Sequence, residues 1–197
     1  FKDYLVSLNK DKIFSTNEKY YALVIGNNNY EHLENLDAAE NDAKVLANIL
    51  EKNYDFEVNL LLNADYETTV NSLFKISRKL KKDDNFLIFY AGHGLATQDG
   101  DKQDLYLLPQ NADTDLLSIS SISRNNLFKE ISNLNPKSVT IFFDACYSGT
   151  SRDNKTLIAS ARPVNILKKV EDNIPENFTI FSASQLNQMS SGLKNGE

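Results

Sequence analysis

Two short segments of the sequence combine residue types that could do nucleophilic chemistry. TIFFDACYSG, at 140–149, ends an apolar run with Cys146, the only cysteine among 197 residues. YAGHG, at 90–94, places His93 between two glycines. An imidazole that accepts the thiol proton, or lies as imidazolium beside a thiolate, activates a cysteine for attack on a carbonyl carbon. A lone cysteine is otherwise a small buried hydrophobe, so catalysis requires a fold that brings the two segments together.

The elements around these segments alternate between strands and helices. Apolar runs and helical spacing predict, in chain order, strand 20–26, helix 38–52, strand 56–62, helix 68–80, strand 85–91, a polar loop at 98–104, a short extended piece at 104–109, helix 124–133, strand 138–145 and strand 178–183. This alternation predicts an α/β fold with a mostly parallel sheet and helices on both faces. Ligands of such sheets bind beyond the carboxyl ends of the strands, where His93 and Cys146 are expected to meet.

The glycines beside His93 have a use in the same chemistry. Gly92 and Gly94 would let the backbone approach a substrate closely. The N–H of Gly94 could pair with that of Cys146 to stabilise the oxyanion of a tetrahedral intermediate.

A different enzyme class also matches part of the pattern. The segment from Cys146 to Arg152 satisfies C-x5-R, the loop in which cysteine phosphatases hold a phosphate. Such a loop needs a helix directly after it, whereas Asp153 and a polar stretch follow here. The phosphatase interpretation also leaves the glycine loop around His93 without a role.

Composition limits the partners and the compartment. The formal net charge of -6 argues against a surface dedicated to nucleic acid or to anionic membranes. No apolar run approaches the roughly 20 residues of a membrane span. One cysteine cannot form an internal disulfide, which fits a reducing compartment, so we expect a cytoplasmic protein.

Together the two segments resemble the catalytic pair of the caspase-like cysteine peptidases, in which the histidine precedes the cysteine by about 50 residues. The resemblance also runs through YALVIG, the NDA of 41–43, DLYLLP and FTIFSAS. It implies a caspase-like three-layer α/β/α sandwich at 19–197, preceded by an extension or linker at 1–18. It further implies a flexible segment between subunits at about 148–170, and a further strand and helix of the family beyond Glu197.

The resemblance also implies the roles of the site residues. Cys146 would be the nucleophile, His93 the general base and later acid, and Gly94 with Cys146 the oxyanion donors. The implied reaction is peptide hydrolysis through a thioester, with no cofactor required. A rival interpretation is a non-catalytic caspase-like module that binds partners, but such a module would have no need of these side chains.

The primary specificity pocket departs from that of true caspases. Caspases cleave after Asp and use arginines with a Gln two residues before the nucleophile, a position that Asp144 occupies here. In metacaspases and orthocaspases, which the chain resembles more closely, the two pocket carboxylates correspond to Asp42 and Asp144. An acidic pocket would bury like charges with an acidic side chain, so we expect cleavage after Arg or Lys. Asp42 could instead be a helix-dipole partner, since it comes early in a helix.

Two further features concern regulation. Asp99, Asp101 and Asp104 lie near where some metacaspases bind an activating calcium. The run lacks the closing glutamate of a high-affinity calcium loop, so a solvated acidic loop is the preferred interpretation. The polar stretch after the nucleophile carries basic residues at which such a peptidase could cut itself: Arg152, Lys155, Arg162, Lys168 and Lys169. Protein substrates with a basic residue before the cleaved bond, and regulatory domains or partners outside this chain that gate a zymogen, are the expected partners.

Overall fold

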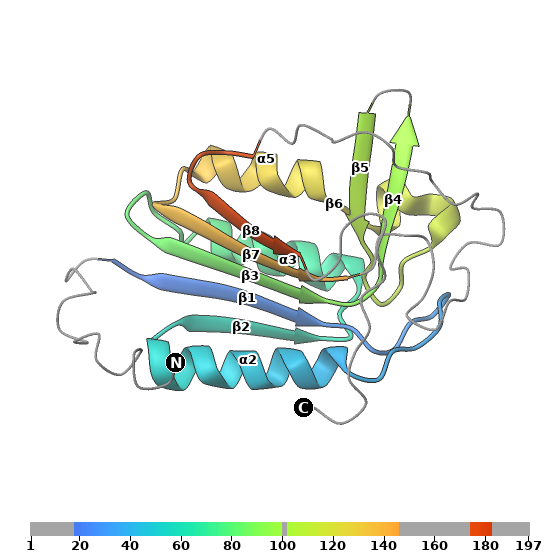
Figure 1. The fold of residues 1–197 in the computed structure, drawn as a ribbon, viewed down its shortest axis with the longest axis horizontal. Coiled ribbons are helices and arrows are strands. Elements are labelled where there is room, and N and C mark those ends of the chain that lie inside the picture. Colours follow the sequence, from blue (N-terminus) through green and yellow to red (C-terminus); the bar gives the residue numbers. More distant parts are fainter. Residues whose placement is uncertain (1–17, 100–101, 146–173, 183–197) are drawn as a thin grey trace.

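The centre of the fold is a parallel five-stranded sheet. The computed structural model of the chain describes residues 18–99, 102–145 and 174–182. All neighbouring strands are parallel, and their order is β2-β1-β3-β7-β8 (Figure 1). The strands are β1 (Tyr20–Gly26), β2 (Glu57–Leu62), β3 (Asn85–Ala91), β7 (Ser138–Asp144) and β8 (Phe178–Ser182). The prediction of an α/β fold with a mostly parallel sheet is confirmed.

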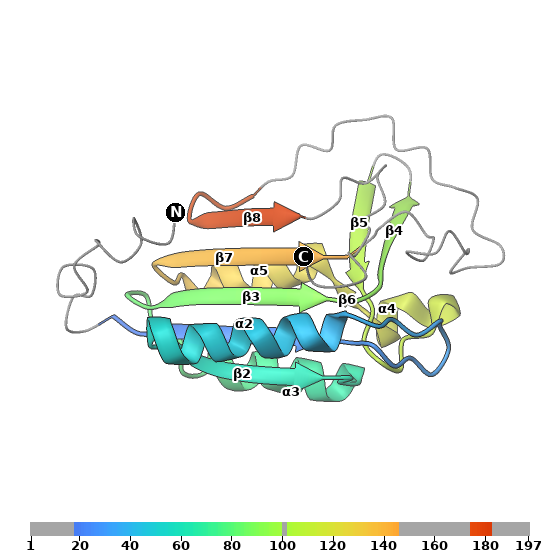
Figure 2. The ribbon, with the colours of Figure 1, turned by 60° about the horizontal axis from the view of Figure 1, so that its bottom comes forward.

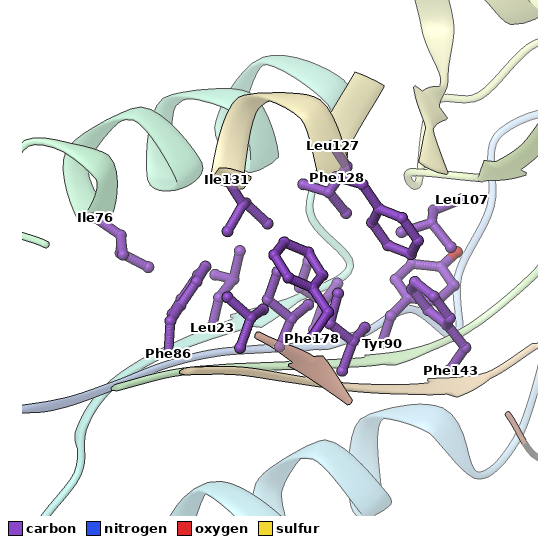
Figure 3. Packing of buried hydrophobic residues seen from close by; sticks show 14 of the residues in the cluster. Leu23, Ile76, Phe86, Tyr90, Leu107, Leu127, Phe128, Ile131, Phe143 and Phe178 are labelled. Carbon is purple, nitrogen blue, oxygen red and sulfur yellow. The ribbon is translucent and has the colours of Figure 1, made fainter. Parts of the chain in front are cut away.

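Helices cover both faces of this sheet. Helix α2 (Ala39–Tyr54) lies on one face, and α3 (Tyr66–Ser77) and α5 (Arg124–Leu134) lie on the other (Figure 2). Successive side chains of a strand point to opposite faces. In β1, therefore, Ala22 and Val24 pack with α2, whereas Leu23 packs with the larger core beneath α3 and α5 (Figure 3). The central strands β1 and β3 are largely apolar on both faces because helices cover both faces.

Small residues bring α2 close to the end of β1. Its buried residues include Ala39, Ala43 and Ala47, which follow one another at intervals of four. A Cβ at Gly26 would lie 2.4 Å from the carbonyl oxygen of Ala39 and 2.7 Å from the Cβ of Ala43. The glycine is thus what allows the first turn of α2 to lie against the carboxyl end of β1.

Helix α3 begins at Tyr66 and ends at Ser77, earlier at both ends than the predicted 68–80. Its start is set by Asp65, whose carboxylate accepts the N–H of Thr68 at 2.7 Å and so caps the first turn. Hydrophobic spacing alone does not locate such a cap. Within the described part of the chain, no helix has the length and apolar character needed to cross a bilayer.

The prediction of a polar loop at 98–104 is wrong. A second, antiparallel sheet contains β4 (Gly94–Asp99), β5 (Lys102–Leu107) and β6 (Ile122–Ser123), and its β4–β5 hairpin stands beyond the carboxyl ends of the main sheet (Figure 1). A 3-10 helix η2 (Thr114–Leu116) and a short helix α4 (Leu117–Ser120) precede β6. The polar character of 98–104 concealed the strands, whereas the Gly100-Asp101 pair, which separates the paired Asp99 and Lys102, is a hairpin signal in the sequence.

Candidate active site

The carboxyl ends of three strands lie level at one edge of the main sheet. The register pairs Gly26 of β1 with Ala91 of β3, and Ala91 with Asp144 of β7. The N–H of Gly92 donates to the carbonyl oxygen of Asp144 at 3.3 Å, which joins the segments that leave β3 and β7. His93 therefore lies just beyond this edge, as the sequence predicts. In the sequence, Cys146 comes two residues after Asp144, just as His93 comes two residues after Ala91. Cys146 itself lies outside the described residues.

His93 is held on three sides. Its side chain is buried, with 3% of the residue exposed. Its backbone N–H donates to the Tyr30 hydroxyl at 2.8 Å, and its carbonyl oxygen accepts the Tyr90 hydroxyl at 2.6 Å. Its Nε2 lies 2.8 Å from the carbonyl oxygen of Glu34. The other histidine, His32, has more than half of its side chain exposed.

The contact with Glu34 assigns the tautomer of His93. A carbonyl oxygen can only accept a hydrogen bond, so Nε2 must carry the proton that it shares with Glu34. In the neutral imidazole, Nδ1 is then the nitrogen with the lone pair. The ring is thus prepared to accept a proton through Nδ1, as a general base must.

The two glycines beside His93 have different surroundings. A Cβ at Gly92 would lie 2.7 Å from the hydroxyl oxygens of both Tyr30 and Tyr90, so Gly92 makes room for these tyrosines, a role that the sequence does not predict. Gly94 is opposite Leu107, and the neighbouring bond runs from the N–H of Leu108 to the carbonyl of His93. Since bonded and non-bonded pairs alternate in an antiparallel ladder, the N–H of Gly94 points away from β5.

Asp42 and Asp144, the predicted pocket carboxylates, lie at the same edge of the sheet. Asp144 is the last residue of β7. It lies on the opposite face of the sheet from the buried Phe143, and α2 covers the face on which Asp144 lies. Asp42 is in the first turn of α2, three residues after Ala39, whose carbonyl lies against Gly26. Both aspartates are half-buried. The structure therefore brings them to one face and one edge.

The proposed calcium ligands are Asp99, Asp101 and Asp104. Among the residues that the structure describes, no three His, Cys, Asp or Glu side chains are grouped so that they could hold a metal ion. The Asp104 carboxylate accepts the Ser123 hydroxyl at 2.5 Å and the N–H of Asn125 at 3.3 Å, at the start of α5. Asp99 belongs to β4, and Asp101 is outside the described residues.

The remaining sequence predictions for this region also lie outside the described residues. They are the thiol of Cys146, the C-x5-R segment, the segment at about 148–170, and the self-cleavage candidates Arg152, Lys155, Arg162, Lys168 and Lys169. The described part of the site is therefore the part around His93.

Sequence reasoning missed the groups that hold His93. Tyr30 was part of an asparagine-rich turn, and Glu34 contributes a backbone carbonyl, which carries no sequence signal. Tyr90 offered a detectable signal, because it is a tyrosine inside an apolar strand, and a buried tyrosine hydroxyl usually finds a hydrogen-bond partner.

Comparison with known proteins identifies the family of the chain. The family model for the caspase domain, of peptidase family C14, matches residues 19–196, so the chain belongs to this family. A crystal structure of a protein from Geobacter sulfurreducens is similar, with a TM-score of 0.55 and 25% sequence identity. The similarity covers 67% of this chain and 52% of that one, so the chain matches about half of that protein's length. No curated protein matches the chain.

Proposed function

We propose that this protein is a cysteine endopeptidase that cleaves proteins after Arg or Lys. The caspase domain is a family of cysteine peptidases, and the chain carries the histidine and the cysteine that the chemistry needs. The observation that carries the proposal is the buried His93, whose Nε2 is bound by the Glu34 carbonyl at the sheet edge where β7 ends. A histidine held in this way is suited to proton transfer.

In the first half of the proposed reaction, His93 takes the proton of the Cys146 thiol through Nδ1. The thiolate attacks the carbonyl carbon of the peptide bond, and the carbonyl electron pair moves to oxygen. The N–H groups of Gly94 and Cys146 would stabilise this oxyanion. When the oxyanion collapses, the C–N bond breaks, and the proton on His93 passes to the leaving amine. The acyl group remains on sulfur as a thioester.

In the second half, a water molecule replaces the amine. His93 removes one proton from the water, and the resulting hydroxide attacks the thioester carbonyl. The C–S bond breaks, the thiolate recovers its proton from His93, and the carboxylic acid product leaves. Atoms and protons balance without a metal or an organic cofactor.

Specificity for Arg or Lys is proposed from the carboxylates at the same edge. Asp144 directly precedes the Ala145-Cys146 pair, and Asp42 is at the start of α2 on the same face. A cationic side chain placed between such groups gains charge-assisted hydrogen bonds, whereas an aspartate would be repelled.

The test uses fluorogenic peptides that end in Arg, Lys or Asp before the reporter group. We expect turnover of the Arg and Lys peptides and none of the Asp peptide. Cys146→Ala should abolish turnover, because the nucleophile is removed. Asp144→Asn should lower kcat/KM for the basic peptides by about 30- to 150-fold, which corresponds to about 2–3 kcal/mol for losing one partner of a partly buried charge pair.

The same experiment separates the alternatives. Turnover only after Asp would contradict the pocket argument, and turnover that survives in Cys146→Ala would contradict the mechanism. A folded wild-type protein that cleaves none of the three peptides would favour the non-catalytic module. Hydrolysis of an aryl phosphate that is lost in Arg152→Ala would favour the phosphatase.

A further inference from the structure

We propose that Tyr30, which the loop at 27–37 holds in place, is a positioning residue for His93. This inference rests on the proposed function and deepens it. Tyr30 lies 63 positions before His93, in a segment that the sequence describes only as a turn.

Tyr30 contacts both the backbone and the ring of His93. Its hydroxyl accepts the His93 N–H at 2.8 Å, and its ring centroid lies 4.6 Å from that of the imidazole. Tyr30 itself is 8% exposed, so water does not readily replace its hydroxyl. The Tyr30 side chain thus binds both the backbone N–H and the imidazole ring of His93.

The same loop supplies the partner of Nε2. The Asn35 side-chain oxygen accepts the backbone N–H of Tyr30 at 2.9 Å, which closes a turn around Glu34. The Glu34 carbonyl is 2.8 Å from Nε2 of His93. The hydrogen bond from Tyr30 to Asn35 therefore fixes Tyr30 and Glu34 relative to each other independently of their contacts with the histidine.

Hydrogen bonds with residues 63 and 64 anchor the first residues of the loop. Asn27 is fully buried, and its amide oxygen accepts the N–H of Ala64 at 3.1 Å. The Asn63 side-chain oxygen accepts the N–H groups of Asn28 and Asn29 at 2.8 and 2.9 Å. These hydrogen bonds hold the loop, and with it Tyr30, in place against the imidazole, whose placement controls the rate of proton transfer.

The first test is Tyr30→Phe, which keeps the aromatic ring and removes the hydroxyl that accepts the His93 N–H. We expect kcat on an Arg peptide to fall about 10- to 100-fold with KM nearly unchanged, because misplacing a catalytic group affects the transition state more than substrate binding. The control is Tyr21→Phe, which removes another buried tyrosine hydroxyl at the opposite end of β1 and should leave kcat unchanged.

The second variant changes the loop without touching Tyr30 or His93. Asn35→Ala removes the acceptor that shapes the turn around Glu34 and should give the same fall in kcat. Asn29→Ala is the matched control: both asparagines are exposed, but the Asn29 side chain contacts Glu40, at 3.5 Å, and not the backbone of Tyr30. Equal kcat values for the two variants would contradict the role of the loop.

A spectroscopic readout is independent of turnover. The chain has two histidines, so long-range ¹H–¹⁵N spectra contain only two imidazole systems, and His32→Gln assigns them. Neutral His93 should be the Nε2–H tautomer in the wild type and a mixture of tautomers in Tyr30→Phe. An unchanged tautomer together with an unchanged kcat would overturn the proposal.

This readout also separates the two levels of inference. If the wild-type protein cleaves no peptide, the proposed function fails, and the tautomer in Tyr30→Phe alone decides the positioning role. If the wild type is active and Tyr30→Phe has wild-type kcat and KM, the positioning role fails and the proposed function stands.

Discussion

Gly26 is where a single methyl group should have the largest effect on the fold. In Gly26→Ala, the new Cβ would lie 2.4 Å from the Ala39 carbonyl oxygen, 2.9 Å from its carbonyl carbon and 2.7 Å from the Ala43 Cβ. Ordinary van der Waals contact begins at 3.4 Å, so the first turn of α2 would have to move by about 1 Å. Two of the three atoms belong to the helix backbone and cannot rotate away.

The cost follows from this geometry. Overpacking a close-packed interior by one methyl group costs about 1–3 kcal/mol, and a backbone obstacle places this site near the upper end. We therefore expect Gly26→Ala to lower the free energy of unfolding by about 3 kcal/mol. In a domain of this size each kcal/mol corresponds to about 2–4 °C, so Tm should fall by about 6–12 °C.

Urea denaturation followed by circular dichroism measures this loss. A double-mutant cycle with Ala43→Gly tests its cause, because Ala43→Gly removes the Cβ contact and leaves the Ala39 carbonyl in place. We expect Ala43→Gly to recover less than half of the loss in the Gly26→Ala background. A loss below about 0.5 kcal/mol in Gly26→Ala, or complete recovery by Ala43→Gly, would refute the backbone-clash argument.

Two further predictions concern helix starts. Hydrogen bonds from Asn63 and then Lys44 lower the pKa of Glu40 below its usual 4.5, so its carboxylate stabilises the fold above that pH and less as pH falls through the lowered pKa. Glu40→Gln should therefore lower the free energy of unfolding by about 1 kcal/mol at pH 7, and this loss should become smaller in acid. Urea midpoints measured from pH 7 to pH 3 test this, with Glu51→Gln as the control. A loss that is the same at every pH would contradict the prediction. Asp65→Ala, which removes the cap of α3, should cost about 1 kcal/mol, while Asp65→Ser should retain most of the stability; equal urea midpoints for the two variants would count against the cap.

Much of the fold could be predicted from local patterns. Apolar runs located the five strands of the main sheet, most clearly β1 and β3, because a strand covered on both faces is apolar throughout. Helical spacing located α2, α3 and α5, with differences of a few residues at their ends. The order of elements also placed His93 and Asp144 at the ends of adjacent strands, which is where the structure has them.

The β4–β5 hairpin could not be predicted in this way. It extends beyond the sheet, so its strands lack the continuous apolar character of β1 or β3. Only the Gly100-Asp101 pair indicated a turn there, and a polar composition hid the strands on either side of it.

The sequence by itself determined the α/β class, the sheet edge at which chemistry is expected, and the residue types available there. Those properties depend on the periodicity of apolar residues and on the order of elements along the chain. Neither requires knowledge of contacts between distant residues. Only the tertiary structure decided that the Tyr30 hydroxyl, the Tyr90 hydroxyl and the Glu34 carbonyl converge on His93, and that Gly92 makes room for the two tyrosines. Tyr30 and Glu34 lie about 60 positions from His93, and a hydrogen bond between such distant groups leaves no periodic trace in the chain.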